Sequence, residues 1–104
     1  MMTERIQKKR EILFMANKQH LVYMLQCNDG TLYTGYTNDL KRRIHMHETG
    51  KGAKYTRGRG PFQVVYVEYF STKEEAMQRE YFIKQLRRDQ KLLLIRGKER
   101  RDEK

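Results

Sequence analysis

The chain has 104 residues, which suffices for one small domain and leaves no room for a second hydrophobic core. It carries 23 Lys and Arg against 13 Asp and Glu, a net charge of +10, and this balance favours a polyanionic partner such as nucleic acid. The single cysteine, Cys27, excludes an internal disulfide and a cysteine-based zinc site. No apolar run reaches the roughly 18 residues of a membrane span, and no signal peptide is apparent, so we expect a cytoplasmic protein with no membrane partner.

Residues 1–19 form the first segment, and their apolar residues are too sparse to define one face of a helix. We expect a flexible basic extension ahead of the folded domain. Met15 is a second plausible translation start, since it stands just before the point where that domain begins.

Two short strands joined by a tight turn are predicted next. Residues 21–27 and 31–37 are rich in Val, Leu, Tyr and Thr, which suit strands. The sequence Asn-Asp-Gly at residues 28–30 fits a three-residue hairpin loop in which Gly30 is left-handed and forms a bulge. A two-residue loop formed by Asp29 and Gly30 is the alternative.

The loop length decides which faces of the sheet two tyrosines occupy, because a slip of one residue moves side chains to the opposite face. With the three-residue loop, Tyr23 lies opposite Gly35, which leaves room beside its ring, and shares a face with Tyr33. With the two-residue loop, the tyrosines lie on opposite faces. Ordinary packing in the core or at its rim is the simpler interpretation of either tyrosine alone.

A short basic helix follows the hairpin, with Thr37 or Asn38 as its cap and Asp39 in its first turn. Arg43 and His47 lie one turn apart and continue the apolar stripe that should pack on the sheet. Such a conflict between pattern and residue type is typical of functional sites. A snorkelling Arg and a His at the boundary of the core are the alternative.

The segment at residues 50–61 contains four glycines and four cations, so its backbone can approach phosphates closely. We expect it to bind nucleic acid through Lys51, Lys54, Tyr55, Arg57 and Arg59. The alternative is a mobile loop in which Tyr55 is the hydrophobic anchor.

A third strand at residues 62–70 and a helix at about residues 72–87 come next, with a capping box at residues 71–74. A last helical turn or two around residues 91–95 can cover the core. The charged residues 96–104 should form a disordered tail.

Glu80 falls inside the apolar arc of the helix at residues 72–87. A carboxylate there needs a partner, which would be Arg43, a metal ion or both. A glutamate at the rim that pairs with Lys84, four residues later, is the alternative.

Five side chains thus stand out in a fixed order along the chain: Tyr23, Tyr33, Arg43, His47 and Glu80. The first lies in the triplet Val-Tyr-Met and the second in Tyr-Thr-Gly, and this ordered set resembles the GIY-YIG nuclease domain. The first triplet has Val where the family usually has Gly, and the second has Thr where it has Ile. The resemblance covers residues 20–95 and is greatest to the small single-domain bacterial members, which share a segment like residues 50–56. It implies an α+β fold in which a small three-stranded antiparallel sheet, in the order strand-strand-helix-strand-helix, is flanked by helices.

The resemblance also implies a metal-dependent endonuclease that hydrolyses phosphodiester bonds, with branched or damaged DNA as the expected substrate. One divalent ion, usually Mg²⁺, would be held by Glu80 and a phosphate oxygen. Tyr23 would act as the general base or pass on a proton, and Tyr33 would orient the water or a phosphate. Arg43 would clamp the scissile phosphate, and His47 would hydrogen-bond Tyr23 or relay its proton.

Two functions of other classes fit the same composition. One is a nucleic-acid-binding module that holds its target without cutting it and works with a partner protein. The other is a basic structural or ribosome-associated protein. The five side chains favour the nuclease. Because the chain has no room for a second DNA-binding domain, we expect weak affinity or a protein partner that adds to it.

Overall fold

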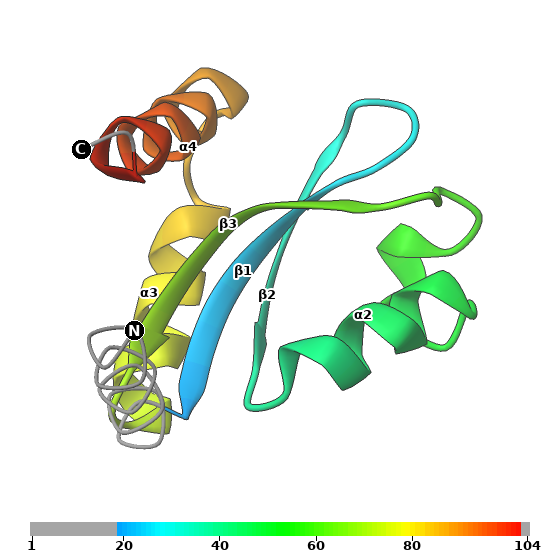
Figure 1. The fold of residues 1–104 in the computed structure, drawn as a ribbon, viewed down its shortest axis with the longest axis horizontal. Coiled ribbons are helices and arrows are strands. Elements are labelled where there is room, and N and C mark those ends of the chain that lie inside the picture. The colour runs from blue at the N-terminus through cyan, green and yellow to red at the C-terminus, as the bar shows by residue number, and fades with distance from the viewer. Residues whose placement is uncertain (1–18, 103–104) are drawn as a thin grey trace, which may run out of the picture.

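The computed structural model describes residues 19–102, with side chains described up to residue 97. The expected basic extension therefore lies outside the described residues, except for Gln19. The elements are β1 (His20–Gln26), β2 (Leu32–Thr37), α2 (Leu40–Glu48), the 3-10 turn η1 (Lys54–Thr56), β3 (Gln63–Phe70), α3 (Lys73–Lys84) and α4 (Arg88–Asp102) (Figure 1). The expected α+β class and three-stranded antiparallel sheet are confirmed.

The hairpin between β1 and β2 has the three-residue loop, so its register is confirmed. The amide of Cys27 donates to Thr31 O and that of Gly30 donates to Cys27 O, both at 2.9 Å. Gly30 has a φ of 84°, the left-handed conformation that a bulge at this position requires. Tyr23 consequently pairs with Gly35 across the two strands.

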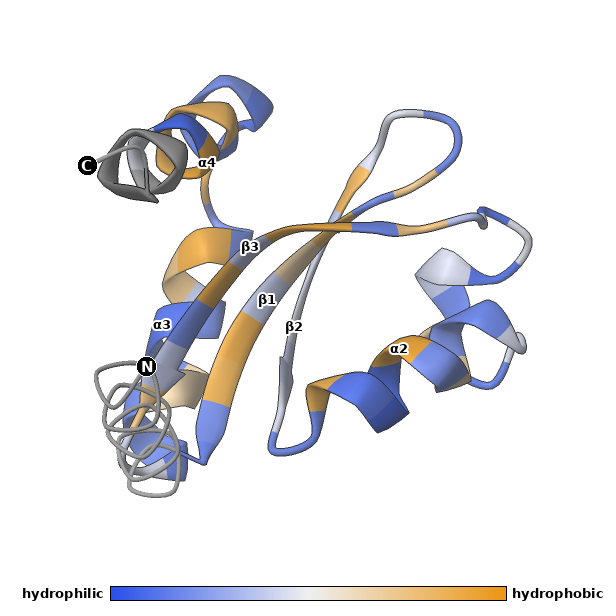
Figure 2. Ribbon diagram, viewed as in Figure 1, coloured by the Kyte–Doolittle hydropathy of each residue, from blue (hydrophilic) through white to orange (hydrophobic). Residues whose placement is uncertain are grey.

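The sheet has the strand order β2-β1-β3, so β1 is the central strand and is covered on both faces (Figure 1). One face carries Val22 and Met24, which pack with α3 and α4. The other face carries Leu21, Tyr23 and Leu25, which pack against α2. Figure 2 shows that β1 is largely hydrophobic, as a strand covered on both faces requires, whereas α2 is mostly hydrophilic. The helix that carries two of the candidate residues therefore lies on the face that holds Tyr23.

The cap of α2 is Asp39, and the expected caps Thr37 and Asn38 are wrong. The side chain of Asp39 accepts from the amide of Arg42 at 3.2 Å. Thr37 Oγ1 instead accepts from the amide of Asp39 at 3.1 Å. Thr37 thus shapes the approach to the helix, and the stronger acceptor takes the cap position.

The cap of α3 is Thr72, one residue later than the expected Ser71. Thr72 Oγ1 accepts from the amide of Glu75 at 3.2 Å and donates to Glu75 Oε1 at 2.8 Å. The pair Ser71 and Glu74 has the same spacing, so the sequence alone offers two boxes. The helix that follows ends at Lys84 rather than near residue 87.

The last helix, α4, runs from Arg88 to Asp102, so the expectation of disorder from residue 96 is wrong as far as residue 102. Lys, Arg and Glu dominate this stretch and are good helix formers, which extends the helix beyond its apolar residues. The other expected domain boundaries stay predictions. No helix in the described part of the chain is long and apolar enough to span a membrane.

Candidate active site

Tyr23 lies at the centre of the candidate site, in the middle of β1. Its side chain is fully buried on the face that α2 covers. Opposite it on β2, a Cβ atom at Gly35 would lie 2.6 Å from Tyr23 Oη and 2.7 Å from its Cζ. The absence of a side chain at Gly35 therefore makes the space in which the Tyr23 hydroxyl lies.

His47, in the last turn of α2, holds the Tyr23 hydroxyl in a chain of hydrogen bonds. His47 Nε2 lies 2.7 Å from Tyr23 Oη, and His47 Nδ1 lies 2.8 Å from Thr56 Oγ1. Thr56 Oγ1 donates to Ala53 O at 2.8 Å, which uses its single proton, so it must accept from His47 Nδ1. A neutral imidazole carries one proton, so Nε2 is the acceptor and Tyr23 donates to it. The backbone carbonyl of Ala53 thus sets the direction of the whole chain.

The loop after α2 presses directly on the imidazole. A Cβ atom at Gly52 would overlap the His47 ring, so the loop backbone packs flat against it. Thr56 is 1% exposed, and the Phe62 ring lies 5.9 Å from the His47 ring between centroids. The part of this loop that we expected to approach phosphates therefore also positions His47.

Arg43 and burial together set the protonation of the site. Arg43 Nε donates to Tyr23 Oη over 3.4 Å, a long hydrogen bond. Burial raises the pKa of Tyr23 to about 12, and the hydrogen bond from Arg43 opposes that rise. Burial lowers the pKa of His47 from 6.5, and the charge of Arg43 lowers it further. At neutral pH, Tyr23 therefore keeps its proton, and His47 is neutral and able to accept one.

Tyr33 begins a row of aromatic rings that leads from the buried site to the surface. Its ring centroid lies 6.2 Å from that of Tyr23 and 5.3 Å from that of His47. Tyr55 stacks on Tyr33 at 6.1 Å, and the guanidinium of Arg59 lies 4.7 Å from the centre of the Tyr55 ring. The expectation that Tyr23 and Tyr33 share a face is confirmed.

Glu80 lies on α3 with its side chain 14% exposed. Its carboxylate pairs with Lys84 Nζ at 3.0 Å, and within the described residues it makes no ion pair with Arg43, whose Nε faces Tyr23 instead. Of the expected partners of Glu80, the ion pair with Arg43 is thus wrong, and the alternative pair with Lys84 is confirmed. The charge of Glu80 nevertheless raises the pKa of Tyr23, as the smallest of several causes, so the carboxylate lies within electrostatic reach of that hydroxyl.

The single carboxylate of Glu80 suits a divalent ion that has few protein ligands. No group of three or more His, Cys, Asp or Glu side chains that could hold a metal occurs in the described part of the chain. Mg²⁺ keeps several waters and needs only one or two carboxylates besides substrate phosphate oxygens. Glu80 therefore fits an Mg²⁺ ion whose other ligands would be water and substrate, and the residues that the structure describes form no closed metal cage.

The expected nucleic-acid-binding residues of the loop differ in their surroundings. Three of its cations are exposed: Lys51, Lys54 and Arg57. Tyr55 is 47% exposed, whereas Arg59 forms an ion pair with Asp29 and covers the Tyr55 ring. Arg59 thus attaches the loop to the hairpin, and the other three cations face solvent.

Two residues that position the site escaped the sequence analysis, namely Thr56 and Gly52. Neither follows a periodic pattern, because both act through His47 on another element. The only signal was the likeness of residues 50–56 to a segment of the small bacterial members.

Fold and geometry together define a small α+β domain with a buried tyrosine hydroxyl, held by a histidine and an arginine, near a largely buried carboxylate. The model of the GIY-YIG catalytic domain matches residues 19–92, and the chain belongs to the GIY-YIG family. This membership points to nuclease chemistry on nucleic acid.

Relatives of similar length share the domain. The UPF0213 protein OB0043 of Oceanobacillus iheyensis is 65% identical over 80% of this chain and 96% of its own length. The solution structure of the UPF0213 protein BH0048 from Bacillus halodurans is 57% identical over 76% of this chain and 84% of that one, with a TM-score of 0.52. The solution structure of the protein EF2693 from E. faecalis is 40% identical over 77% of this chain and 85% of that one, with a TM-score of 0.56.

Proposed function

We propose that this protein is an endonuclease that hydrolyses phosphodiester bonds in DNA with the help of a divalent metal ion, and that it acts on branched or damaged substrates. The observation that carries the proposal is the directed hydrogen-bond chain from Ala53 O through Thr56 and His47 to the Tyr23 hydroxyl. A buried tyrosine that only packs needs one hydrogen-bond partner for its hydroxyl, and any acceptor would serve. A tyrosine that accepts a proton and passes its own proton on needs a partner that can take that proton, and neutral His47 is such a partner.

The chain gives Tyr23 a way to act as a base although its pKa is about 12. Free tyrosinate is scarce at neutral pH, so Tyr23 takes a proton from the attacking water while its own proton moves to His47 Nε2. His47 then carries both protons, and Thr56 Oγ1 continues to accept from Nδ1. The hydroxide forms the new bond to phosphorus as the bond to the leaving oxygen breaks.

Arg43 and Glu80 handle charge in this mechanism. Arg43 keeps terminal guanidinium donors beyond the Nε that binds Tyr23, and these suit an equatorial oxygen of the reacting phosphate. Glu80 would hold the metal ion, for which Lys84 is the cationic partner in this structure. When bound, the ion supplies Lewis-acid charge that stabilises the phosphorane-like transition state. Tyr33, beside both Tyr23 and His47, would orient the water.

The test is a cleavage time course on branched, nicked and single-stranded DNA with Mg²⁺, beside a gel-shift titration in EDTA. Glu80→Gln should slow cleavage at least roughly a hundredfold, the usual scale for losing one charge-stabilising group. Its DNA binding should persist or tighten, because a negative charge is lost while the loop cations remain. Glu74→Gln, exposed in the first turn of the same helix, is the matched control and should cut like the wild type.

Two results would count against the proposal. If Glu80→Gln cuts as fast as the wild type, Glu80 holds no catalytic ion. If the wild type binds DNA but cuts no substrate with Mg²⁺ or Mn²⁺, the protein is a binding module that works with a partner, and the nuclease is excluded.

A further inference from the structure

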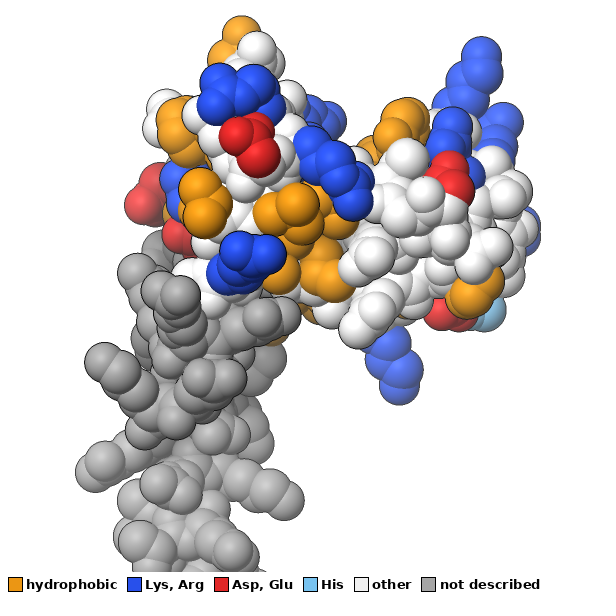
Figure 3. All heavy atoms as spheres, turned by 90° about the horizontal axis from the view of Figure 1, so that it is seen from above, with side chains coloured by type: hydrophobic (Ala, Val, Ile, Leu, Met, Phe, Trp, Pro, Cys, Tyr) orange, Lys and Arg blue, Asp and Glu red, His pale blue; other side chains and the backbone are white. Residues whose placement is uncertain are grey.

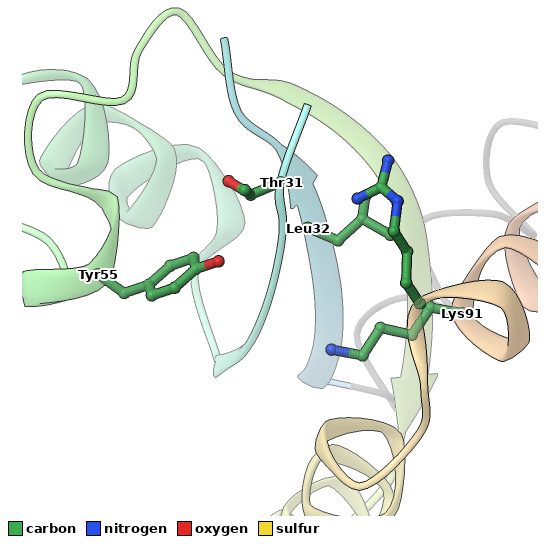
Figure 4. Close-up of a pocket in the computed structure, with 5 residues that line it drawn as sticks. Thr31, Leu32, Tyr55 and Lys91 are labelled. Carbon is green, nitrogen blue, oxygen red and sulfur yellow. The ribbon is translucent and has the colours of Figure 1, made fainter. Parts of the chain in front are cut away.

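A hollow of about 170 Å³ lies between the start of β2, the loop after α2 and the first turns of α4 (Figure 4). It is lined by Thr31, Leu32, Tyr55, Arg88 and Lys91. Figure 4 shows Tyr55 and Lys91 extending toward each other from opposite sides of the hollow. Three segments that are distant in the sequence thus form one recess.

This recess contains two cations, Arg88 and Lys91. No carboxylate forms an ion pair with Lys91 or Arg88 within the described residues. Arg88 Nη1 donates to Gly30 O at 2.8 Å, which fixes the guanidinium against the hairpin loop but leaves its charge in place. Burial lowers the pKa of Lys91, and the charge of Lys84 lowers it further. An anion in the recess would relieve both effects on Lys91.

Two links make the recess continuous with the candidate active site. Lys84 pairs with Glu80 and is close enough to Lys91 to act on its charge, so a row of cations leads from the carboxylate to the recess. On the opposite side, Tyr55 stacks on Tyr33. The Glu80 carboxylate and the cations of the recess therefore belong to one connected set of side chains.

One face of the molecule is hollowed at its edge and carries several exposed cations. Figure 3 shows Lys and Arg side chains on both sides of a notch in the upper edge of the face seen from above. Both sides of the notch could therefore contact one polyanion.

We propose that this recess binds a backbone phosphate of a nucleic-acid strand that also contacts the candidate active site, with Lys91 and Arg88 as its cations. The proposal rests on the proposed function for the presence of nucleic acid, but not for cleavage. A phosphate suits the recess because its several oxygens can accept from an ammonium, a guanidinium and the Tyr55 hydroxyl at once. The apolar side chain of Leu32 offers a contact for the attached sugar.

The test measures how salt weakens binding of a fluorescein-labelled single-stranded oligonucleotide, by anisotropy in EDTA. Each phosphate contact to a single strand adds about 0.7 to the slope of log affinity against log salt, so Lys91→Gln should lower that slope by about 0.7. Lys91→Arg should restore it. Lys73→Gln removes the same charge at the first residue of α3, the end of that helix farthest from α4, and should leave the slope unchanged (Figure 1).

A second arm distinguishes a strand phosphate from a free one. Titration with inorganic phosphate, followed by the NMR signal of the Lys91 side chain, should give weak binding that the oligonucleotide displaces. If the signal responds to phosphate while Lys91→Gln leaves the oligonucleotide slope unchanged, the recess binds a free anion and the proposal fails. Equal slopes for Lys91→Gln and Lys73→Gln would also overturn it.

Failure of the two proposals can be told apart. A wild type that binds with the expected dependence on Lys91 but does not cut would refute the nuclease and leave the recess standing. A wild type that cuts DNA, but whose binding does not depend on Lys91, would refute the recess and leave the nuclease standing. A wild type that binds no nucleic acid at all would refute both.

Discussion

Replacing Tyr23 by Phe should reduce the loss of folding stability at alkaline pH, because the buried hydroxyl resists ionisation only in the folded state. The pKa of Tyr23 is raised from 10.0 to about 12, so between these values the unfolded chain loses a proton that the folded chain keeps. The unfolded state then binds fewer protons, and the free energy of unfolding falls as pH rises. At 1.36 kcal/mol per pK unit, the ionisation of Tyr23 lowers the free energy of unfolding by about 1.4 kcal/mol at pH 11 and by about 2.7 kcal/mol well above pH 12.

Urea denaturation followed by circular dichroism at pH 8, 9, 10 and 11 measures this effect. Tyr23→Phe should be less stable than the wild type at pH 8 by about 1–3 kcal/mol, because His47 Nε2 is left without a donor. By pH 11 that gap should narrow by about 1.4 kcal/mol. Tyr81→Phe, at a side chain 68% exposed on α3, is the control and should follow the wild-type pH dependence. If the free energy of unfolding falls equally with pH in Tyr23→Phe and the wild type, burial does not raise the pKa of the hydroxyl. The proton relay would then not start from a protonated Tyr23.

Two further substitutions test the packing and the hydrogen bonds around this hydroxyl. Gly35→Ala should cost about 1–3 kcal/mol by urea denaturation, because its Cβ would lie 2.6 Å from Tyr23 Oη. Gly97→Ala, in open space on α4, should instead gain up to about 1 kcal/mol, and a loss at both sites would point to a general intolerance of alanine. Thr56→Val should destabilise the fold by about 1–3 kcal/mol, since His47 Nδ1 loses its acceptor, and ¹⁵N NMR should show His47 no longer held as one tautomer. Thr56→Ser should restore both readings, and a single tautomer retained in the valine variant would refute the assignment.

Local chemistry made the hairpin predictable. The Asn-Asp-Gly turn selects the three-residue loop, and the loop fixes the register by which Tyr23 faces Gly35. Once that register is known, the side-chain alternation places Tyr33 on the same face. The position of His47 also followed from sequence, because a polar residue continued the apolar stripe of a helix that had to pack on this sheet.

What the sequence could not supply are choices between near-equal local options and contacts between distant segments. Ser71 and Thr72 each precede a glutamate by three residues, and only the end of β3 decides which one caps α3. The partner of Glu80 is of the second kind. Lys84 at i+4 competes with Arg43 on another helix, and the nearer residue pairs because Arg43 is engaged with Tyr23.

The hydrogen-bond chain to Tyr23 also depends on a contact between distant segments, namely α2 and the loop that contains Thr56. Thr56 belongs to η1, so its carbonyl partner is three residues back in the same 3-10 turn. The proton direction at Tyr23 is therefore set by a backbone turn in the loop that also carries Lys51, Lys54 and Arg57. If nucleic acid binds these cations as proposed, it would contact the same loop that orients His47. Under the proposed mechanism, one short loop would therefore couple nucleic-acid binding to proton transfer, and Gly52 is the residue that lets its backbone lie against the imidazole.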